Sequence, residues 1–316
     1  GGGEGLFVGQ TRKSGTVKAG GIAGARACRR SALKVMAGGG FALAGAVVLP
    51  GLVRANSPIT FGLTPVFLDS DLEIMALMTR YFSERLNHPV QLVKRRTYQE
   101  ITAMLLSGQL DAAWICGFPY IQYRDRLSLL AVPQYLGRPL YKSYLIAEID
   151  RDVSDFSGLR GDVHAFSDPN SNSGYLVTRH LLWQMQETPD SYFGRTLFTY
   201  GHRNVIRAVS SGLANSGSVD GYVWDVMKET EDTLVAGTQV VRKSEFLGFP
   251  PIASAAQPKN PVATKALAKA LLDMSGDPLG RKILGILRLD GFVERNPSLF
   301  DGIARKYADI QQDGNG

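Results

Sequence analysis

The stretch Tyr98-Gln99-Glu100-Ile101 is matched 104 residues later by His202-Arg203-Asn204-Val205. The match continues without a gap through two further pairs of segments: Ser107-Gly108 with Ser211-Gly212, and Trp114-Ile115-Cys116-Gly117-Phe118 with Ser218-Val219-Asp220-Gly221-Tyr222. Each copy is typical of a helix that stops at Ser-Gly, followed by a short strand and a glycine turn into the next helix. Two such α/β units predict two similar lobes with a ligand cleft between them. The alternative is a chance match between two ordinary helix ends.

The charge of the chain is concentrated at its start. The 316 residues carry a formal net charge of +6, but residues 1–55 hold eight Lys or Arg and one Glu. The remainder has 27 basic and 28 acidic residues, so it offers no basic surface of the kind that binds nucleic acid. Its length and its 44% hydrophobic content are sufficient for two globular domains.

Residues 1–55 have the pattern of an export leader. Arg29-Arg30-Ser31-Ala32-Leu33-Lys34 resembles a twin-arginine motif, and a Gly/Ala-rich apolar run follows from Val35 to Leu49. Val53-Arg54-Ala55 fits the small-x-small rule for cleavage. We therefore expect a periplasmic protein that is exported by the twin-arginine route. The alternative is a leader that stays uncleaved as a membrane anchor.

Segments with strand and helix patterns alternate along the rest of the chain, which is typical of mostly parallel sheets flanked by helices. We expect lobe 1 over residues 56–147, beginning with a strand at Ile59–Leu63, and lobe 2 over residues 148–245, beginning with a strand at Val163–Phe166. Residues 246–316 are expected to cross back and to pack their helices on lobe 1.

The segment Ser167-Asp168-Pro169-Asn170-Ser171-Asn172-Ser173-Gly174 is the clearest candidate for ligand binding. It follows a predicted strand and precedes a predicted helix. Ser171, Asn172 and Ser173 are all competent helix caps, and Gly174 allows close approach to the backbone. The amides and the positive dipole end of a helix start attract an oxyanion. The alternative is a helix cap without a ligand.

His202 and Tyr98 occupy equivalent positions in the repeat, where a strand end meets a helix start. Both side chains can donate a hydrogen bond to an oxyanion, so we expect both to face the cleft. The repeat also places Cys116 opposite Asp220, each at a strand end before a glycine, so we expect both to face the cleft and contact the ligand. Their alternative roles are a buried small hydrophobe for Cys116 and a helix cap for Asp220.

Aromatic residues surround these positions, and we expect Tyr120, Tyr144 and Tyr222 to lie near the ligand. No His or Cys shows the spacing of a metal site, so neither a metal nor a cofactor is expected.

The chain resembles the PhnD-like family, the periplasmic solute-binding proteins of phosphonate, phosphite and phosphate ABC transporters. The resemblance covers residues 58–300 and is carried by five segments: Thr97-Tyr98-Gln99-Glu100, Gly108 to Trp114, Pro119-Tyr120, Ser167 to Leu176, and Gly201-His202. It implies a two-lobed periplasmic binding protein of type II with hinge closure. It also implies that the oxyanion is held by Ser171, Asn172, Ser173, His202 and Tyr98.

We therefore expect a protein that is not an enzyme, captures a phosphonate, phosphite or phosphate, and reaches the membrane only through an ABC transporter permease. Cys116 stands where the family often has a small residue, and arsenite-sensing relatives bind the metalloid through a cleft cysteine. The alternative function is therefore a sensor subunit that binds arsenite or another oxyanion and signals to a histidine kinase. A secreted hydrolase is disfavoured because no Gly-x-Ser-x-Gly or His-Glu-x-x-His motif is present.

Overall fold

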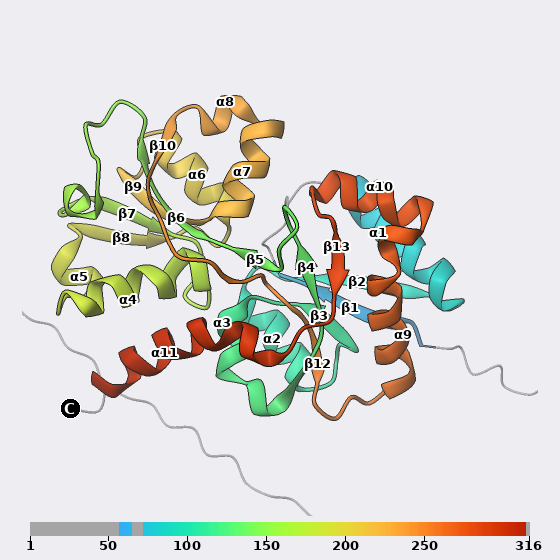
Figure 1. Ribbon diagram of the computed structural model, residues 1–316. Coiled ribbons are helices and arrows are strands. Elements are labelled where there is room, and N and C mark those ends of the chain that lie inside the picture. Colours follow the sequence, from blue (N-terminus) through green and yellow to red (C-terminus); the bar gives the residue numbers. More distant parts are fainter. Residues whose placement is uncertain (1–56, 65–71, 314–316) are drawn as a thin grey trace, which may run out of the picture. The chain divides into compact units, whose positions relative to one another are not determined.

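The structure is a computed structural model that describes residues 57–64 and 72–313, so the expected leader at residues 1–55 lies outside the described residues. Within the described ranges, the strands form two main sheets and a short ribbon (Figure 1).

The sheet of lobe 1 has the strand order β13-β4-β12-β3-β1-β2. Its strands are β1 Ile59–Leu63, β2 Val90–Lys94, β3 Ala112–Trp114, β4 Leu127–Gln134, β12 Ile252–Ala255 and β13 Gly291–Val293. β1 pairs in parallel with β2 and β3, whereas β12 and β13 are antiparallel to the strands beside them.

The sheet of lobe 2 has the order β10-β6-β9-β7-β8. Its strands are β6 Ser143–Glu148, β7 Val163–Phe166, β8 Arg195–Phe198, β9 Ser216–Asp220 and β10 Thr238–Lys243. β7 pairs in parallel with β8 and β9, and β6 and β10 extend the sheet in antiparallel fashion. Each lobe is therefore built around parallel strands with antiparallel additions, as expected for the fold class.

The helices follow the strands of each lobe. Lobe 1 carries α1 Leu72–Leu86, α2 Tyr98–Leu106, α3 Gly117–Gln122, α9 Pro261–Leu272 and α10 Pro278–Leu287. Lobe 2 carries α4 Val177–Gln184, α5 Pro189–Tyr192, α6 His202–Ser210, α7 Gly221–Thr230 and α8 Asp232–Val235, and α11 Asp301–Asp313 ends the described chain.

The sequence repeat is a structural repeat. α2 begins at Tyr98 and α6 begins at His202, and each has nine residues. Both helices end at Ser-Gly, and Gly108 and Gly212 adopt left-handed backbone angles with φ of 68° and 73°. A residue with a side chain would be strained there, so glycine lets each helix turn sharply into the next strand.

The chain leaves lobe 1 earlier than the sequence pattern indicates. β5, Leu140–Tyr141, pairs with β11, Leu247–Gly248, in the short ribbon, and β6 then joins lobe 2. The expected boundary at residue 147 is therefore wrong, because β6 pairs with β9 and β10 and the crossing falls at Lys142. An apolar strand pattern reveals that a strand is buried but not which sheet receives it.

The C-terminal segment divides its contacts between the lobes. α9 and α10 pack beside α1, whereas α11 packs against both α3 and α4 (Figure 1). His180 of α4 and Asp309 of α11 lie 2.8 Å apart, Nε2 to Oδ2. Thus α9 and α10 contact α1 of lobe 1, while α11 contacts both lobes.

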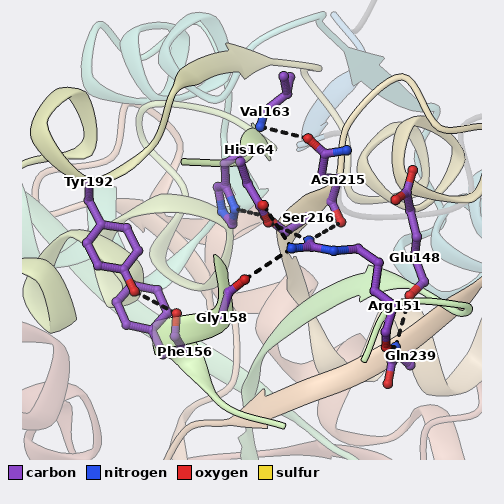
Figure 2. A network of polar contacts seen from close by, with 11 residues as sticks. Glu148, Arg151, Phe156, Gly158, Val163, His164, Tyr192, Asn215, Ser216 and Gln239 are labelled. Atoms are coloured by element: carbon purple, nitrogen blue, oxygen red, sulfur yellow. Dashed lines mark hydrogen bonds and ion pairs between the residues drawn. The ribbon is translucent and has the colours of Figure 1, made fainter. Parts of the chain in front are cut away.

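A polar network that is buried at His164 and Ser216 and partly exposed at Arg151 and Asn215 supports the sheet of lobe 2 (Figure 2). His164 of β7 bonds Ser216 Oγ and Ser218 Oγ through its two ring nitrogens, each at 2.8 Å. Arg151 forms a two-pronged ion pair with Asp162, with N–O distances of 2.6 and 3.0 Å. Burial lowers the pKa of His164 to about 3, so its ring is neutral and structural.

Across residues 57–64 and 72–313, no helix is long and apolar enough to span a bilayer.

Candidate ligand-binding site

The segment Ser167–Gly174 connects β7 to the helix that continues as α4. Ser171 caps this helix, since its Oγ accepts the Gly174 amide at 3.0 Å. The first turn, Asn172–Leu176, is π-helical, and such wide turns are frequent at functional sites. A Cβ on Gly174 would lie 1.8 Å from Ser167 Oγ and 2.7 Å from Ser167 Cβ, so only glycine fits this turn.

Tyr98 and His202, the two equivalent residues of the repeat, contact each other. Tyr98 Oη and His202 Nε2 are 3.1 Å apart, and both side chains are buried. The Asp220 amide donates to His202 Nδ1 at 3.1 Å, which requires Nδ1 to be unprotonated. Burial lowers the pKa of His202 to about 3, so the neutral ring carries its proton on Nε2. That proton is donated to Tyr98 Oη, and the hydroxyl hydrogen of Tyr98 is left to donate elsewhere.

Asn172 joins the two lobes. Its amide donates to Cys116 Sγ at 3.2 Å, and its Nδ2 donates to Tyr141 Oη at 2.8 Å. Cys116 is the N-cap residue directly before α3 of lobe 1, and Tyr141 lies on β5. Burial raises the pKa of the Cys116 thiol to about 12, so the group is a neutral thiol at physiological pH.

Two carboxylates complete the arrangement. Asp220 caps α7, because its Oδ1 accepts the amides of Tyr222 and Val223 at 2.8 and 3.4 Å. Asp168 Oδ2 accepts the Tyr98 amide across the lobes at 3.2 Å, and so meets the N-terminus of α2. Burial raises the pKa of both acids, that of Asp220 to about 7. Asp220 thus has the helix-cap role that the sequence left open as an alternative.

We call these residues the polar cluster: Tyr98, Cys116, Tyr141, Ser167, Asp168, Ser171, Asn172, Ser173, Gly174, His202 and Asp220. All of them are buried. Two polar side-chain atoms in the cluster, Ser167 Oγ and Asn172 Oδ1, have no hydrogen-bond partner within the described part of the chain. A buried polar atom left without a partner is costly, so these atoms are positioned to bond a ligand.

The cluster differs from the residues selected from the sequence. Tyr141, Ser167 and Asp168 belong to it but were not expected as site residues. Ser167 and Asp168 were within the singled-out segment, so their position could have been found. Tyr141 gave no local signal, because it reaches Asn172 only through the pairing of β5 with β11.

The three tyrosines expected near the ligand make other contacts. The Tyr120 ring packs on Phe300 with ring centroids 4.9 Å apart, and Tyr222 Oη donates to the Leu287 carbonyl at 2.5 Å. Tyr144 Oη donates to Asp225 Oδ2 at 3.0 Å. Tyr144 and Tyr222 line a separate cavity of about 380 Å³ that also touches Tyr141.

In the described ranges, no group of three His, Cys, Asp or Glu residues is arranged to hold a metal ion.

The raised pKa of Asp220 predicts a pH dependence of stability. Its pKa is about 7 in the folded protein and about 3.9 when unfolded, so its contribution is fully present below about pH 4 and is lost as the pH rises through 7. Asp220→Asn keeps the cap acceptor but does not titrate. We expect the variant to gain stability relative to wild type between pH 4.5 and pH 8 in urea unfolding. If wild type and Asp220→Asn differ in free energy of unfolding by the same amount at pH 4.5 and at pH 8, the pKa of Asp220 is not raised in the folded protein.

The burial and the raised pKa of Cys116 predict an unreactive thiol. In a Cys28→Ser chain, Cys116 is the sole remaining cysteine. We expect its alkylation by iodoacetamide at pH 8 to be at least about a hundredfold slower in the native protein than in urea. Mass spectrometry of timed samples measures both rates, and similar rates would show that the thiol is exposed.

Residues 61–300 match the family described as "ABC transporter, phosphonate, periplasmic substrate-binding protein". A binding protein component of an ABC phosphonate transporter from Pseudomonas aeruginosa has a similar structure, with a TM-score of 0.74, 20% identity, and coverage of 81% of this chain and 88% of that chain. PhnD1 from Prochlorococcus marinus, solved in complex with methylphosphonate, gives a TM-score of 0.72, 18% identity, and coverage of 80% and 98%. An ancestral arginine-binding protein bound to arginine is also similar, with a TM-score of 0.54, 15% identity, and coverage of 73% of this chain and 98% of that chain.

At these identities the solved structures show the fold, that of a type II periplasmic binding protein. The family match shows more, because it spans most of the chain. Its members are substrate-binding components and not enzymes. The chain belongs to the family of periplasmic phosphonate-binding proteins of ABC transporters.

Proposed function

We propose that this protein captures a small oxyanion of the phosphonate class in the polar cluster and delivers it to an ABC transporter permease. The observation that carries the proposal is the meeting of polar groups from both lobes: Tyr98 of lobe 1 bonds His202 and Asp168 of lobe 2, and Cys116 of lobe 1 accepts the Asn172 amide at the helix start. The unpartnered Ser167 Oγ adds a hydroxyl donor at the same place.

The chemistry of the cluster suits an anion that still carries a proton. The cluster contains no Lys or Arg, and the donors it offers an anion are neutral hydroxyls and amides, aided by a helix dipole. The His202 imidazole donates to Tyr98 and so orients the Tyr98 hydroxyl. The cluster also offers acceptors, namely Asn172 Oδ1 and the Asp220 carboxylate. A monoprotonated phosphonate, phosphite or phosphate supplies both acceptor oxygens and an O–H donor, and so matches both sets of groups.

Hinge closure is supported by the burial of the cluster. Tyr98, Asn172 and His202 are each no more than 2% exposed, so a ligand enters only if the lobes separate. Separation breaks the bonds of Tyr98 to His202 and to Asp168, of Asn172 to Cys116, and of Tyr222 to the Leu287 carbonyl. The crossings at Lys142 and between β10 and β11 would serve as the hinge, and the permease would read the closed form.

Calorimetric titration with methylphosphonate, phosphite and phosphate tests the proposal, with sulfate as a control that carries no proton at neutral pH. A ligand at one hundred times its Kd raises the free energy of unfolding by about 2.7 kcal/mol, which urea unfolding detects independently. The proposal fails if none of the three phosphorus oxyanions produces heat or stabilisation.

The sensor alternative depends on Cys116, whose Sγ lies in the cluster. Its raised pKa disfavours the thiolate that a soft metalloid requires, so transport is the better-supported function. Arsenite titration of wild type and Cys116→Ser separates the two: arsenite binding that the substitution abolishes, with phosphite binding retained, would favour the sensor.

We also propose export by the twin-arginine route, from Arg29 and Arg30, which lie outside the described residues. Replacing both with Lys should leave the precursor in the cytoplasm. Normal export of that variant would reject the route and leave the binding function untouched.

A further inference from the structure

A cavity of about 380 Å³ lies beside the polar cluster, between the β4–β5 connection and α7. Its size is within the range of small-molecule sites, roughly 300–1,000 Å³. Tyr135, Tyr141, Tyr144, Tyr222 and Phe246 form much of its wall. The cavity is therefore large enough for a ligand substituent of several carbon atoms, and its aromatic wall can pack against the apolar part of that substituent.

The cavity and the polar cluster share their boundary. Tyr141 lines the cavity, and its Oη accepts the hydrogen bond from Asn172 Nδ2 at 2.8 Å. Gly221 also lines the cavity and directly follows Asp220. A Cβ on Gly221 would lie 2.6 Å from the Tyr144 ring, so the absence of a side chain at Gly221 allows the Tyr144 ring to pack directly against the backbone next to Asp220. A ligand held at Asn172 and Asp220 would thus point its substituent toward the cavity.

The charged groups of the cavity are mainly basic. Arg138, Lys142 and Lys243 line it, against the single carboxylate Asp225. Lys142 and Arg138 lie over the Phe246 ring at 4.5 and 5.0 Å, and these three cations have no ion-pair partner within 4 Å among the described residues. Asp225 already accepts the Tyr144 hydroxyl. Lys243 also interacts with the Asp225 carboxylate, so the cavity carries three cations against one carboxylate.

We propose that this cavity holds the organic substituent of the ligand and selects one that ends in a second anionic group, such as a carboxylate. The inference rests on the proposed function, because it assumes that the phosphonate end occupies the polar cluster. The aromatic wall covers the linking methylene groups, and Lys142 and Lys243 bind the terminal anion. An ammonium group at that end would instead face three like charges against the one carboxylate of Asp225, which already accepts the Tyr144 hydroxyl.

Three phosphonates that differ in their substituent test the proposal by calorimetry at 0.15 M salt: methylphosphonate, 3-phosphonopropionate and 2-aminoethylphosphonate. We expect 3-phosphonopropionate to bind at least about tenfold more tightly than methylphosphonate, since charge-assisted hydrogen bonds to a carboxylate are strong. The ammonium probe should bind no more tightly than methylphosphonate. Tighter binding of the ammonium probe would overturn the assignment of an anionic substituent.

Paired variants locate the effect. In Lys142→Gln/Lys243→Gln, the preference for 3-phosphonopropionate over methylphosphonate should fall to about threefold or less. Lys265→Gln, which removes a charge from an exposed position on α9, should keep the full preference. If methylphosphonate binds but the carboxylate probe gains nothing, this inference alone is wrong. If neither probe binds, the proposed function fails and the inference fails with it.

Discussion

Gly174→Ala is expected to abolish measurable phosphonate binding and to lower the free energy of unfolding by about 1–3 kcal/mol. The added Cβ would lie 1.8 Å from Ser167 Oγ, 2.7 Å from Ser167 Cβ and 3.0 Å from Ser171 Oγ. Rotation of the Ser167 hydroxyl relieves the first contact but not the second, so the backbone of the turn must move. That movement displaces the Ser171 cap and the amides that are proposed to hold the oxyanion.

Gly285→Ala provides the matched control for this prediction. Gly285 lies within α10, and a Cβ there would meet no atom within 4 Å. Alanine in a helix interior is favoured over glycine by about 0.5–1 kcal/mol, so this variant should be as stable as wild type or more so, with unchanged binding. Calorimetry and urea unfolding of both variants make the comparison.

A second substitution tests the cause of the Gly174→Ala effect. Ser167→Gly removes both of the closest atoms, so the double variant Ser167→Gly/Gly174→Ala should recover part of the stability lost in Gly174→Ala. If the double variant is no more stable than the sum of the single effects predicts, the clash with Ser167 does not explain the loss.

His202→Ala is expected to weaken phosphonate binding by about a hundredfold, equivalent to about 2.7 kcal/mol. The imidazole accepts the Asp220 amide at Nδ1 and donates to Tyr98 Oη at Nε2. Alanine leaves both partners buried without a bond, at a cost of about 1–3 kcal/mol each. Tyr98 also loses the donor that directs its hydroxyl hydrogen away from the ring and toward the ligand.

Two further variants separate binding from general stability. Tyr98→Phe removes only the hydroxyl, so it should weaken binding by about tenfold while the Asp220 bond to His202 remains. His88→Ala changes a histidine of lobe 1 that lies outside the cluster, and it should bind as wild type does. Equal binding by wild type and His202→Ala would remove this residue from the site.

Local patterns in the sequence predicted the repeating architecture well. The offset between Tyr98 and His202 placed the starts of α2 and α6 correctly, and the Ser-Gly pairs marked their ends. These features depend on neighbours along the chain: apolar spacing, a cap residue, and a glycine that can adopt positive φ. The twin-arginine leader and the choice of oxyanion remain predictions.

The sequence by itself determined that this protein has two α/β halves, and that a cap-rich turn follows the strand at Val163–Phe166. Only the tertiary structure decided that Tyr98 bonds His202, that β6 joins lobe 2, and that Tyr141 reaches Asn172 while Tyr144 turns to Asp225. The physical reason is that these outcomes depend on which strands pair and how side chains from distant segments pack. Secondary structure follows from short-range preferences, whereas the partners of a buried hydroxyl or strand follow from contacts that no local pattern records.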